Sequence, residues 1–339
     1  QLKNFKYESL TNFYRRWYNP DMQAVIVVGD IDVNQVEEKI KTIFSDVPAP
    51  AVPTEKPLFP VQENAEPVIG VLTDPEATSS SIEMLWRRQP MIPVALNNTD
   101  LAYQFDLVKA FISAIMNERF SDITAKPDAP FLSAGFGVGK LCNTCEATSG
   151  NVSFKDGESV KAFTAFMTEV EKLKRYGFTE SEVARAKDNI LQHYEKAAEG
   201  AATRKNAEFV RPLLNNFFFN DPYMNPETEL QLAQAMCGML NAQILNQILP
   251  MFLQETNVLI LYNGPEKEGL ANPTEAELAA AYASVKTAEI APNVEESTNE
   301  PLLDATALKG SKVKKETKTL YGATEWTLKN GVKVTVLPT

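Results

Sequence analysis

Few residues of this chain could ligate a metal or carry thiol chemistry, because it holds three cysteines and one histidine among 339 residues. Cys142 and Cys145 form a C-x-x-C pair, a spacing used by zinc sites and by thiol–disulfide oxidoreductases. A structural zinc site needs four ligands, and Cys237 and His193 are the only other thiol and imidazole candidates. A thioredoxin-like site needs a helix after the pair, whereas the residues after Cys145 have a strand pattern. We expect two loop cysteines, with a redox or metal role as the alternative.

His193 lies in the stretch LQHYEK, within a predicted helix whose inner face includes Ala186 and Ile190. It falls at the border of this apolar stripe, while Glu195 and Glu199 lie on other parts of the helix. We therefore expect a structural histidine, partly buried or at the surface, with a ligand role as the alternative.

Gly135, Gly137 and Gly139 alternate in the stretch GFGVG. A phosphate-binding loop would need a following helix and a Lys-Ser/Thr pair, and neither follows. The pattern instead favours small residues at a place where another layer packs close to a strand.

Charge and hydropathy exclude two classes of partner. The net charge is −11 and the pI is about 4.9, which argues against nucleic acid because its binding depends on Lys and Arg neutralising phosphates. No apolar run approaches the roughly 18–20 residues that a membrane span needs. The chain opens at Gln1 without an apolar leader, so we expect no signal peptide within it.

The first elements are predicted from the stretch FYRRWYNPDMQAVIVVGDID. Phe13–Trp17 has the spacing of an amphipathic helix end, and Asn19-Pro20-Asp21 stops that helix. Met22–Val28 is rich in Val and Ile and suits a strand buried on both faces. A helix with apolar residues at helical spacing follows over Val33–Phe44.

The middle of the chain predicts an α+β fold, in which a mainly antiparallel sheet is covered by a layer of helices. A proline-punctuated linker precedes it. The capping box Thr179–Glu182 opens one of the helices, and the last helix is predicted to break near Asn241. The predicted strands are 67–74, 80–86, 131–138, 148–154 and 258–262, and the predicted helices are 98–120, 157–176, one from 179, 202–219 and 227–253.

The end of the chain changes character. One polar helix is predicted over 274–288 and a polar connector follows it. Asn330-Gly331 is a two-residue turn signal between alternating apolar residues, so the chain is predicted to end in a hairpin.

Together, the N-P-D stop with its VIVVGD strand and the final L-x-N-G-x-x-V-x-V-x-P pattern (residues 328–338) are similar to pitrilysin/insulinase-type (inverzincin) zinc metallopeptidases. The resemblance covers most of the chain. It implies the pitrilysin/mitochondrial-processing-peptidase-like metallohydrolase fold, and an internal section of a longer protein centred on a non-catalytic second repeat. The implied parts are the end of the zinc-bearing first repeat (1–45), a linker (46–62), the second repeat (63–265), a connector (266–320) and the opening hairpin of a third repeat (321–339).

Members of this family hydrolyse peptides with zinc held by an H-x-x-E-H motif and a distal Glu, and the motif Glu acts as general base. One histidine cannot supply that motif. The resemblance therefore implies zinc in the longer parent, and neither a catalytic residue nor a metal ligand within this chain. In this family an Arg/Tyr pair also contacts substrate. The pair belongs to the later half of the longer protein, so the resemblance assigns that role to no residue of this chain.

The resemblance also implies one contact with substrate. In such enzymes the segment after the first long helix of the second repeat can hold the substrate's N-terminal end. The matching residues are Asn117, Glu118, Arg119 and Phe120, although the segment lacks the glycine-rich character of the best-known members. A plain helix C-terminus, with Arg119 near the negative end of the helix dipole, is the alternative.

The implied function is a non-catalytic middle portion that forms the chamber wall of a clamshell peptidase and positions peptide substrates, with the other repeats of the same polypeptide as partners. A scaffold subunit of the same fold without peptidase activity is the alternative, and a free-standing binding module is a third. By resemblance, a bacterial parent would be exported to the periplasm. Strands 22–28 and 332–337 would lack their original sheets, so we predict that they pair with each other, within or between chains, or dock on the second repeat.

Overall fold

The computed structural model describes residues 3–293, 303–304, 306 and 309–338, so parts of the predicted connector 266–320 lie outside the described residues. The chain divides into two compact units, residues 1–292 and 293–339.

The first unit begins with two amphipathic helices, α1 (Tyr7–Trp17) and α2 (Val33–Phe44), with a short 3-10 helix at Pro20–Met22 between them. The end of α1 and the whole of α2 were predicted, and neither helix buries a residue. The strand predicted over Met22–Val28 is wrong, because this segment forms no strand and Val25 and Val27 are 53% and 46% exposed. A strand is stable only when a neighbour takes up its backbone groups, and none of the described residues pairs with this segment.

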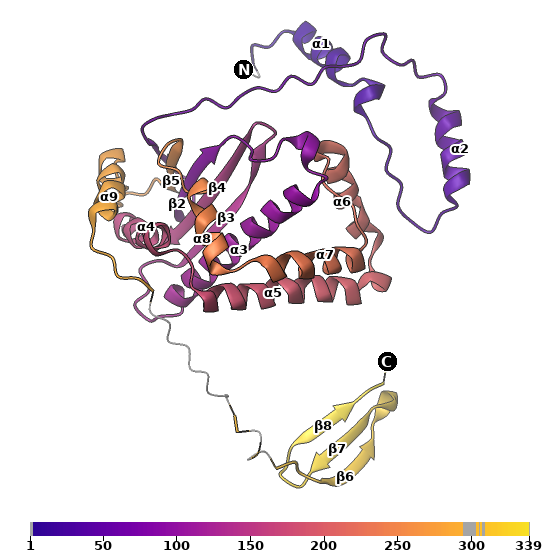
Figure 1. Cartoon of the computed structure of the whole chain (residues 1–339), viewed down its shortest axis with the longest axis vertical. Helices are drawn as coiled ribbons and strands as arrows, with labels where there is room; N and C mark the ends of the chain where they lie inside the picture. Colours follow the sequence, from indigo (N-terminus) through magenta and orange to yellow (C-terminus); the bar gives the residue numbers. More distant parts are fainter. Residues whose placement is uncertain (1–2, 294–302, 305, 307–308, 339) are drawn as a thin grey trace. The chain divides into compact units, whose positions relative to one another are not determined.

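A five-stranded sheet forms the centre of the first unit (Figure 1). Its strand order is β1-β5-β2-β4-β3. Only the β1–β5 pair is parallel, so the predicted mainly antiparallel sheet is confirmed. The strands are β1 (Val68–Asp74), β2 (Ser80–Arg88), β3 (Ser133–Cys142), β4 (Cys145–Phe154) and β5 (Val258–Pro265).

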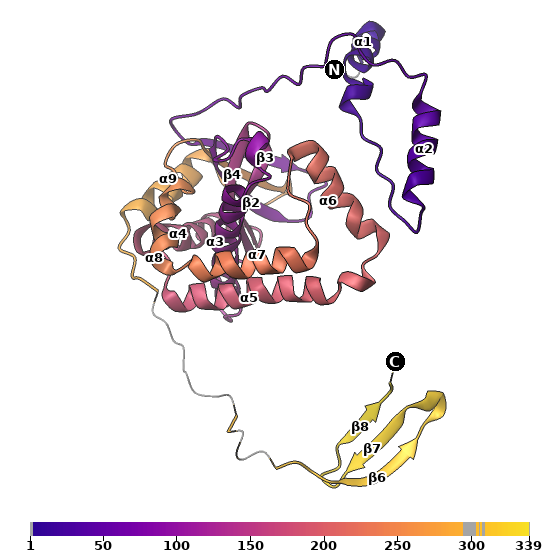
Figure 2. The ribbon, with the colours of Figure 1, turned by 45° about the vertical axis from the view of Figure 1, so that its right-hand side comes forward.

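Helices cover one face of this sheet, as predicted. Helices α3 and α4 pack directly on the strands, and α5 and α7 run side by side as an outer layer next to α3 (Figures 1 and 2). The helices are α3 (Asp100–Thr124), α4 (Ser159–Tyr176), α5 (Glu180–Glu199), α6 (Asn206–Phe219), α7 (Pro226–Met239), α8 (Ala242–Ile248) and α9 (Glu275–Thr287). Further 3-10 helices lie at Val94–Leu96, Ala201–Thr203 and Leu249–Met251.

Local capping signals set several helix starts. Thr99 caps α3 by accepting a hydrogen bond from Ala102 N, and Thr179 and Glu182 form the predicted capping box of α5. Asn241 caps α8, so the predicted helix over 227–253 is broken where its sequence indicated. Each such cap stabilises a helix by about 1 kcal/mol because it satisfies an unpaired N–H group of the first turn.

The core lies between the helices and the inner face of the sheet. Ile82, Met84 and Trp86 of β2 are buried there against the aromatic and aliphatic side chains of α3 and α4. Fully burying one such side chain contributes about 1.5–3 kcal/mol. The largest fully buried side chains include Trp86, Tyr262, Phe111, Phe120, Phe163, Phe166 and Phe252.

The outer face of the sheet is different. Glu83, Asn151 and Gly135 lie in one row across β2, β4 and β3, and the first two are exposed. A Cβ added at Gly135 or Gly139 would meet nothing within 4 Å. The expectation that another layer packs close to these glycines is therefore wrong, because they lie on the face that the helices leave uncovered.

The second unit contains a three-stranded antiparallel sheet of order β6-β7-β8, with β6 (Val313–Lys318), β7 (Thr324–Leu328) and β8 (Lys333–Val336). The predicted hairpin is confirmed, with Gly331 at a φ of 90° in its turn. Strand β6 was not predicted, because every one of its residues is exposed and it carries no apolar alternation. Since β8 pairs with β7 and residues 22–28 form no strand, the predicted pairing of these two segments within the chain is wrong. Their pairing between chains and their docking on the second repeat stay predictions.

Candidate functional site

The predicted substrate segment Asn117–Phe120 lies inside α3, not after it. The helix continues to Thr124, because residues 121–124 contain no helix breaker and the next proline is Pro127. Arg119 is therefore five residues from the end of the helix, outside the last turn where the dipole effect acts. The alternative explanation of Arg119 as a helix C-terminus residue is wrong for this reason.

Asn117 binds the backbone of the edge strand β3. Its Nδ2 donates to Phe136 O at 2.9 Å, and its Oδ1 accepts from Phe136 N at 2.9 Å. The side-chain amide thus takes the place that a neighbouring strand would occupy at this residue. Strand β3 is the last strand of the sheet order, so Asn117 satisfies one position of an otherwise open sheet edge.

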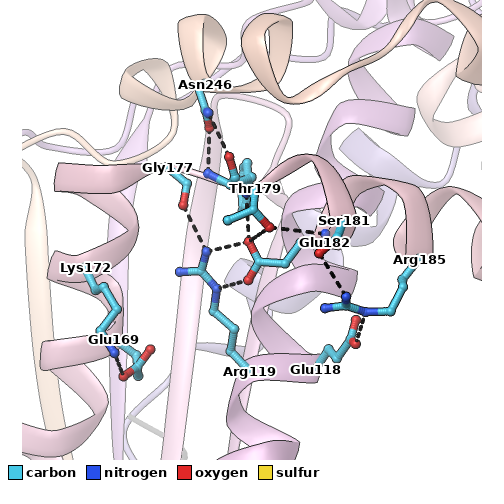
Figure 3. Close-up of polar contacts among 11 residues, drawn as sticks. Glu118, Arg119, Glu169, Lys172, Gly177, Thr179, Ser181, Glu182, Arg185 and Asn246 are labelled. Atoms are coloured by element: carbon cyan, nitrogen blue, oxygen red, sulfur yellow. Dashed lines mark hydrogen bonds and ion pairs between the residues drawn. The ribbon is translucent and has the colours of Figure 1, made fainter. Parts of the chain in front are cut away.

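Arg119 forms a buried ion pair with Glu182 of α5 (Figure 3). Its Nε and Nη2 donate to the two carboxylate oxygens at 2.6 and 2.9 Å, and Nη2 also donates to Gly177 O at 2.9 Å. Burial raises the pKa of Glu182, but the hydrogen bond and charge of Arg119 and the bonds from Thr179 outweigh it, so the net pKa is lowered. Within the described residues Arg119 Nη1 is buried without a hydrogen-bond partner.

The other two residues of the segment have opposite environments. Phe120 is fully buried and stacks on Phe166, with ring centroids 5.0 Å apart. Glu118 is one-third exposed and accepts from Arg185 Nε at 2.7 Å, an interaction drawn in Figure 3. Contact of the four residues with substrate stays a prediction, and Glu118 is the member whose charged group reaches solvent.

Cys142 and Cys145 end β3 and begin β4, so they are strand residues and not the loop cysteines that we expected. Cys142 is exposed, and hydrogen bonds from Thr144 lower the pKa of its thiol. Cys145 is buried, and burial raises the pKa of its thiol. The strands are longer than predicted because the two-residue turn 143–144 suffices to reverse the chain.

His193 is exposed on α5, where its ring lies edge-on to Tyr194. A surface structural histidine was one of the expected outcomes. No group of three or more His, Cys, Asp or Glu side chains suited to a metal occurs among the described residues. With one histidine in the whole sequence, the residues of this chain do not fit the zinc site of the H-x-x-E-H type.

A pocket of about 400 Å³ lies between α5, α6 and α7. Lys196, Arg204 and Glu229 line it. Burial raises the pKa of Glu229, and the charges of His193 and Arg204 partly offset this. None of the residues of the predicted substrate segment lines this pocket, so it is separate from that segment.

Sequence reasoning missed the partners of the predicted residues. Glu182 was recognised as a capping residue, but its pairing with Arg119 joins positions 63 residues apart and has no local signal. The edge position of β3 was also missed, because strand order depends on how distant segments pair.

No described helix is long and apolar enough to cross a membrane.

Comparison with known proteins gives the family. The model of the family described as "Peptidase M16 inactive domain" matches residues 4–190, more than half of the chain. "Probable zinc protease PqqL" of Escherichia coli K12 is 24% identical over 237 residues, which cover 70% of this chain and 25% of that protein. "Zinc protease PQQL-like" of Arabidopsis thaliana is 21% identical over 327 residues, which cover 96% of this chain and 31% of that protein.

The fold agrees with solved structures. The periplasmic protease PqqL from Escherichia coli is similar with a TM-score of 0.75 and 21% identity, over 98% of this chain and 36% of that one. The chain spans 25% and 31% of the length of the two curated relatives named above. The pitrilysin-like fold and the resemblance to this class of zinc peptidase are both confirmed. The chain belongs to the Peptidase M16 inactive domain family.

Proposed function

We propose that this chain is a non-catalytic section of a longer zinc metallopeptidase, where it forms part of the wall of a chamber that encloses peptide substrates. The observation that carries the proposal is the match to an inactive peptidase domain in a chain with a single histidine. Zinc and the general base would then be supplied by another section of the longer protein, and no chemical step runs through the residues present here.

The parts of the chain take the roles that the resemblance implies. Residues 1–45 would complete the zinc-bearing first repeat, and 46–62 would link it to the second repeat at 63–265. Residues 266–320 would connect to the second half of the longer protein. Residues 321–339 would form the opening hairpin of the third repeat. The exposed apolar faces of α1 and α2 support this proposal, because a helix with a strong apolar stripe is normally buried against a partner. By analogy with PqqL, described as periplasmic, we propose the periplasm as the location.

The free edge of β3 is the proposed peptide contact. Backbone groups of successive strand residues point to alternate sides, and those of Phe136 point away from β4 because they bind Asn117. The N–H and C=O groups of Val138 then point to the same open side. An extended peptide can add to such an edge by main-chain hydrogen bonds. Gly137 and Gly139 leave the outer face beside it free of bulky side chains.

Substitution of Val138 tests the peptide contact. Val138→Pro removes the N–H at the edge but no bond of the β3–β4 ladder, so we expect weaker binding of a labelled unstructured peptide in fluorescence anisotropy. Val138→Ala retains the N–H and should bind as the wild type does. Equal binding by the wild type and both variants would contradict a contact at this edge.

A scaffold subunit without peptidase activity is the second candidate. The observation that favours it is the same absence of zinc-site residues, which an inactive partner subunit would share. A complete H-x-x-E-H motif with a distal Glu elsewhere in the longer protein supports the peptidase, and a degraded motif supports the scaffold.

A further inference from the structure

The two cysteines of the β3–β4 hairpin lie opposite each other. Cys142 and Cys145 are directly paired in the strand register, on either side of the turn 143–144. Directly opposed residues of an antiparallel pair have Cα atoms about 4.5–5.5 Å apart and side chains on the same face. A disulfide spans Cα separations of about 4.4–6.8 Å, so the backbone is already placed for one.

The two thiols differ in access. Cys142 is exposed, and its Sγ lies 3.3 Å from Thr144 Oγ1. Cys145 is 3% exposed. A disulfide reagent in solution therefore reaches Cys142 first, and its lowered pKa increases the share of reactive thiolate. Cys145 lies behind it in the position of a resolving thiol.

We propose that Cys142 and Cys145 are a thiol–disulfide exchange site, which takes a small dialkyl disulfide of the glutathione type and becomes a cross-strand disulfide. The Cys142 thiolate attacks one sulfur of the reagent, which forms a mixed disulfide and releases one thiolate. Cys145 then loses its proton to solvent, and its sulfur attacks Cys142 Sγ and releases the second thiolate. The two cysteines lose two electrons and two protons, and the reagent is reduced to two thiols.

The third cysteine provides an internal reference. Cys237 is fully buried in α7, and burial raises the pKa of its thiol. It therefore remains reduced while the hairpin pair reacts. Because Cys145 is buried and its pKa is raised, the second step is the slower one, and the mixed disulfide at Cys142 accumulates briefly before it resolves.

The test is intact-mass analysis of the full chain. The reduced protein is incubated with oxidised glutathione, quenched with acid at intervals and alkylated after denaturation. We expect a transient glutathione adduct, then a product that has lost two hydrogen atoms and holds one alkylatable thiol, at Cys237. The Cys142→Ser variant, altered at an exposed position, should give neither species, whereas Cys237→Ser should behave as the wild type does.

Three outcomes overturn the proposal. The first is retention of three alkylatable thiols under conditions that oxidise a reference dithiol. The second is a glutathione adduct at Cys142 that never resolves, and the third is a disulfide that includes Cys237. Since none of these readouts involves peptides, failure of this proposal is distinguishable from failure of the proposed peptidase role.

Discussion

Asn117 of α3 and Phe136 of β3 are joined by two hydrogen bonds of 2.9 Å, in which a side-chain amide pairs with both backbone groups of an edge residue. This contact fixes the long central helix to the last strand of the sheet. It also closes one position of the edge to other chains, while the neighbouring position at Val138 is open within the described structure.

Replacement of Asn117 tests this closure. Asn117→Ala removes both hydrogen bonds to the backbone of Phe136. Each such bond contributes about 0.5–1.5 kcal/mol, so we expect a loss of about 1–3 kcal/mol in the free energy of unfolding, measured in urea. Asn151→Ala, at an exposed position on the outer face, should change it by less than about 0.5 kcal/mol. A variant at Asn117 as stable as the wild type would show that the edge does not depend on this amide.

The Arg119–Glu182 pair predicts a second stability effect. Both residues are more than nine-tenths buried, so Glu182→Gln leaves an uncompensated charge and should cost about 3–5 kcal/mol. Glu118→Gln is the matched control on the same helix. Its pairing with Arg185 is partly exposed, and its loss should cost less than about 1 kcal/mol. If Glu182→Gln and Glu118→Gln lowered the free energy of unfolding in denaturant equally, a stabilising role for the buried Arg119–Glu182 ion pair would be contradicted.

The same pair predicts a dependence on pH. The pKa of Glu182 in the folded protein is below its ordinary value of 4.5. Its contribution to stability is therefore present above pH about 4.5 and is lost as the pH falls through the lowered folded-state pKa. Urea unfolding of the wild type between pH 7 and pH 3 should show this decline, and the difference between the wild type and Glu182→Gln should shrink toward pH 3. If the stability difference between the wild type and Glu182→Gln stayed constant over this pH range, the charge of Glu182 would not be its cause.

Gly177, at the end of α4, is predicted to be replaced by alanine only with a loss of stability. Its φ is 70° and its ψ is −152°, a region that side chains disfavour, and an added Cβ would overlap with the side chain of Asn246. Gly177→Ala should destabilise the fold by about 1–3 kcal/mol or more. Gly238→Ala, inside α7 where a Cβ meets nothing within 4 Å, should be neutral or stabilise by about 0.5–1 kcal/mol. Thermal unfolding of the two variants compares them directly.

The sequence predicted those features that depend on neighbouring residues. Thr179 and Asn241 cap helices because their side chains reach backbone N–H groups three residues away, and Gly331 permits a tight turn by its own backbone freedom. The spacing of apolar residues likewise predicted the sheet and its covering helices, because burial of one face sets that period.

Features that depend on distant partners were not predictable in this way. Met22–Val28 has the composition of a buried strand, yet it forms none because no described strand lies beside it. Arg119 looked like a helix-end residue, since its partner Glu182 is 63 positions away. The strand order places β3 at an edge of the sheet. This order depends on pairing between segments that are distant in the sequence, so neither the edge position nor the role of Asn117 could be predicted from local sequence patterns.

We propose that this chain shapes the chamber of a zinc peptidase whose chemistry lies elsewhere in the longer protein. The most direct measurement is hydrolysis of an unstructured fluorogenic peptide by this chain and by the longer protein, each with added zinc and with a chelator. We predict activity in the longer protein alone, abolished by the chelator and restored by zinc. Zinc-dependent cleavage by this chain itself would contradict the account, because one histidine would then have to suffice.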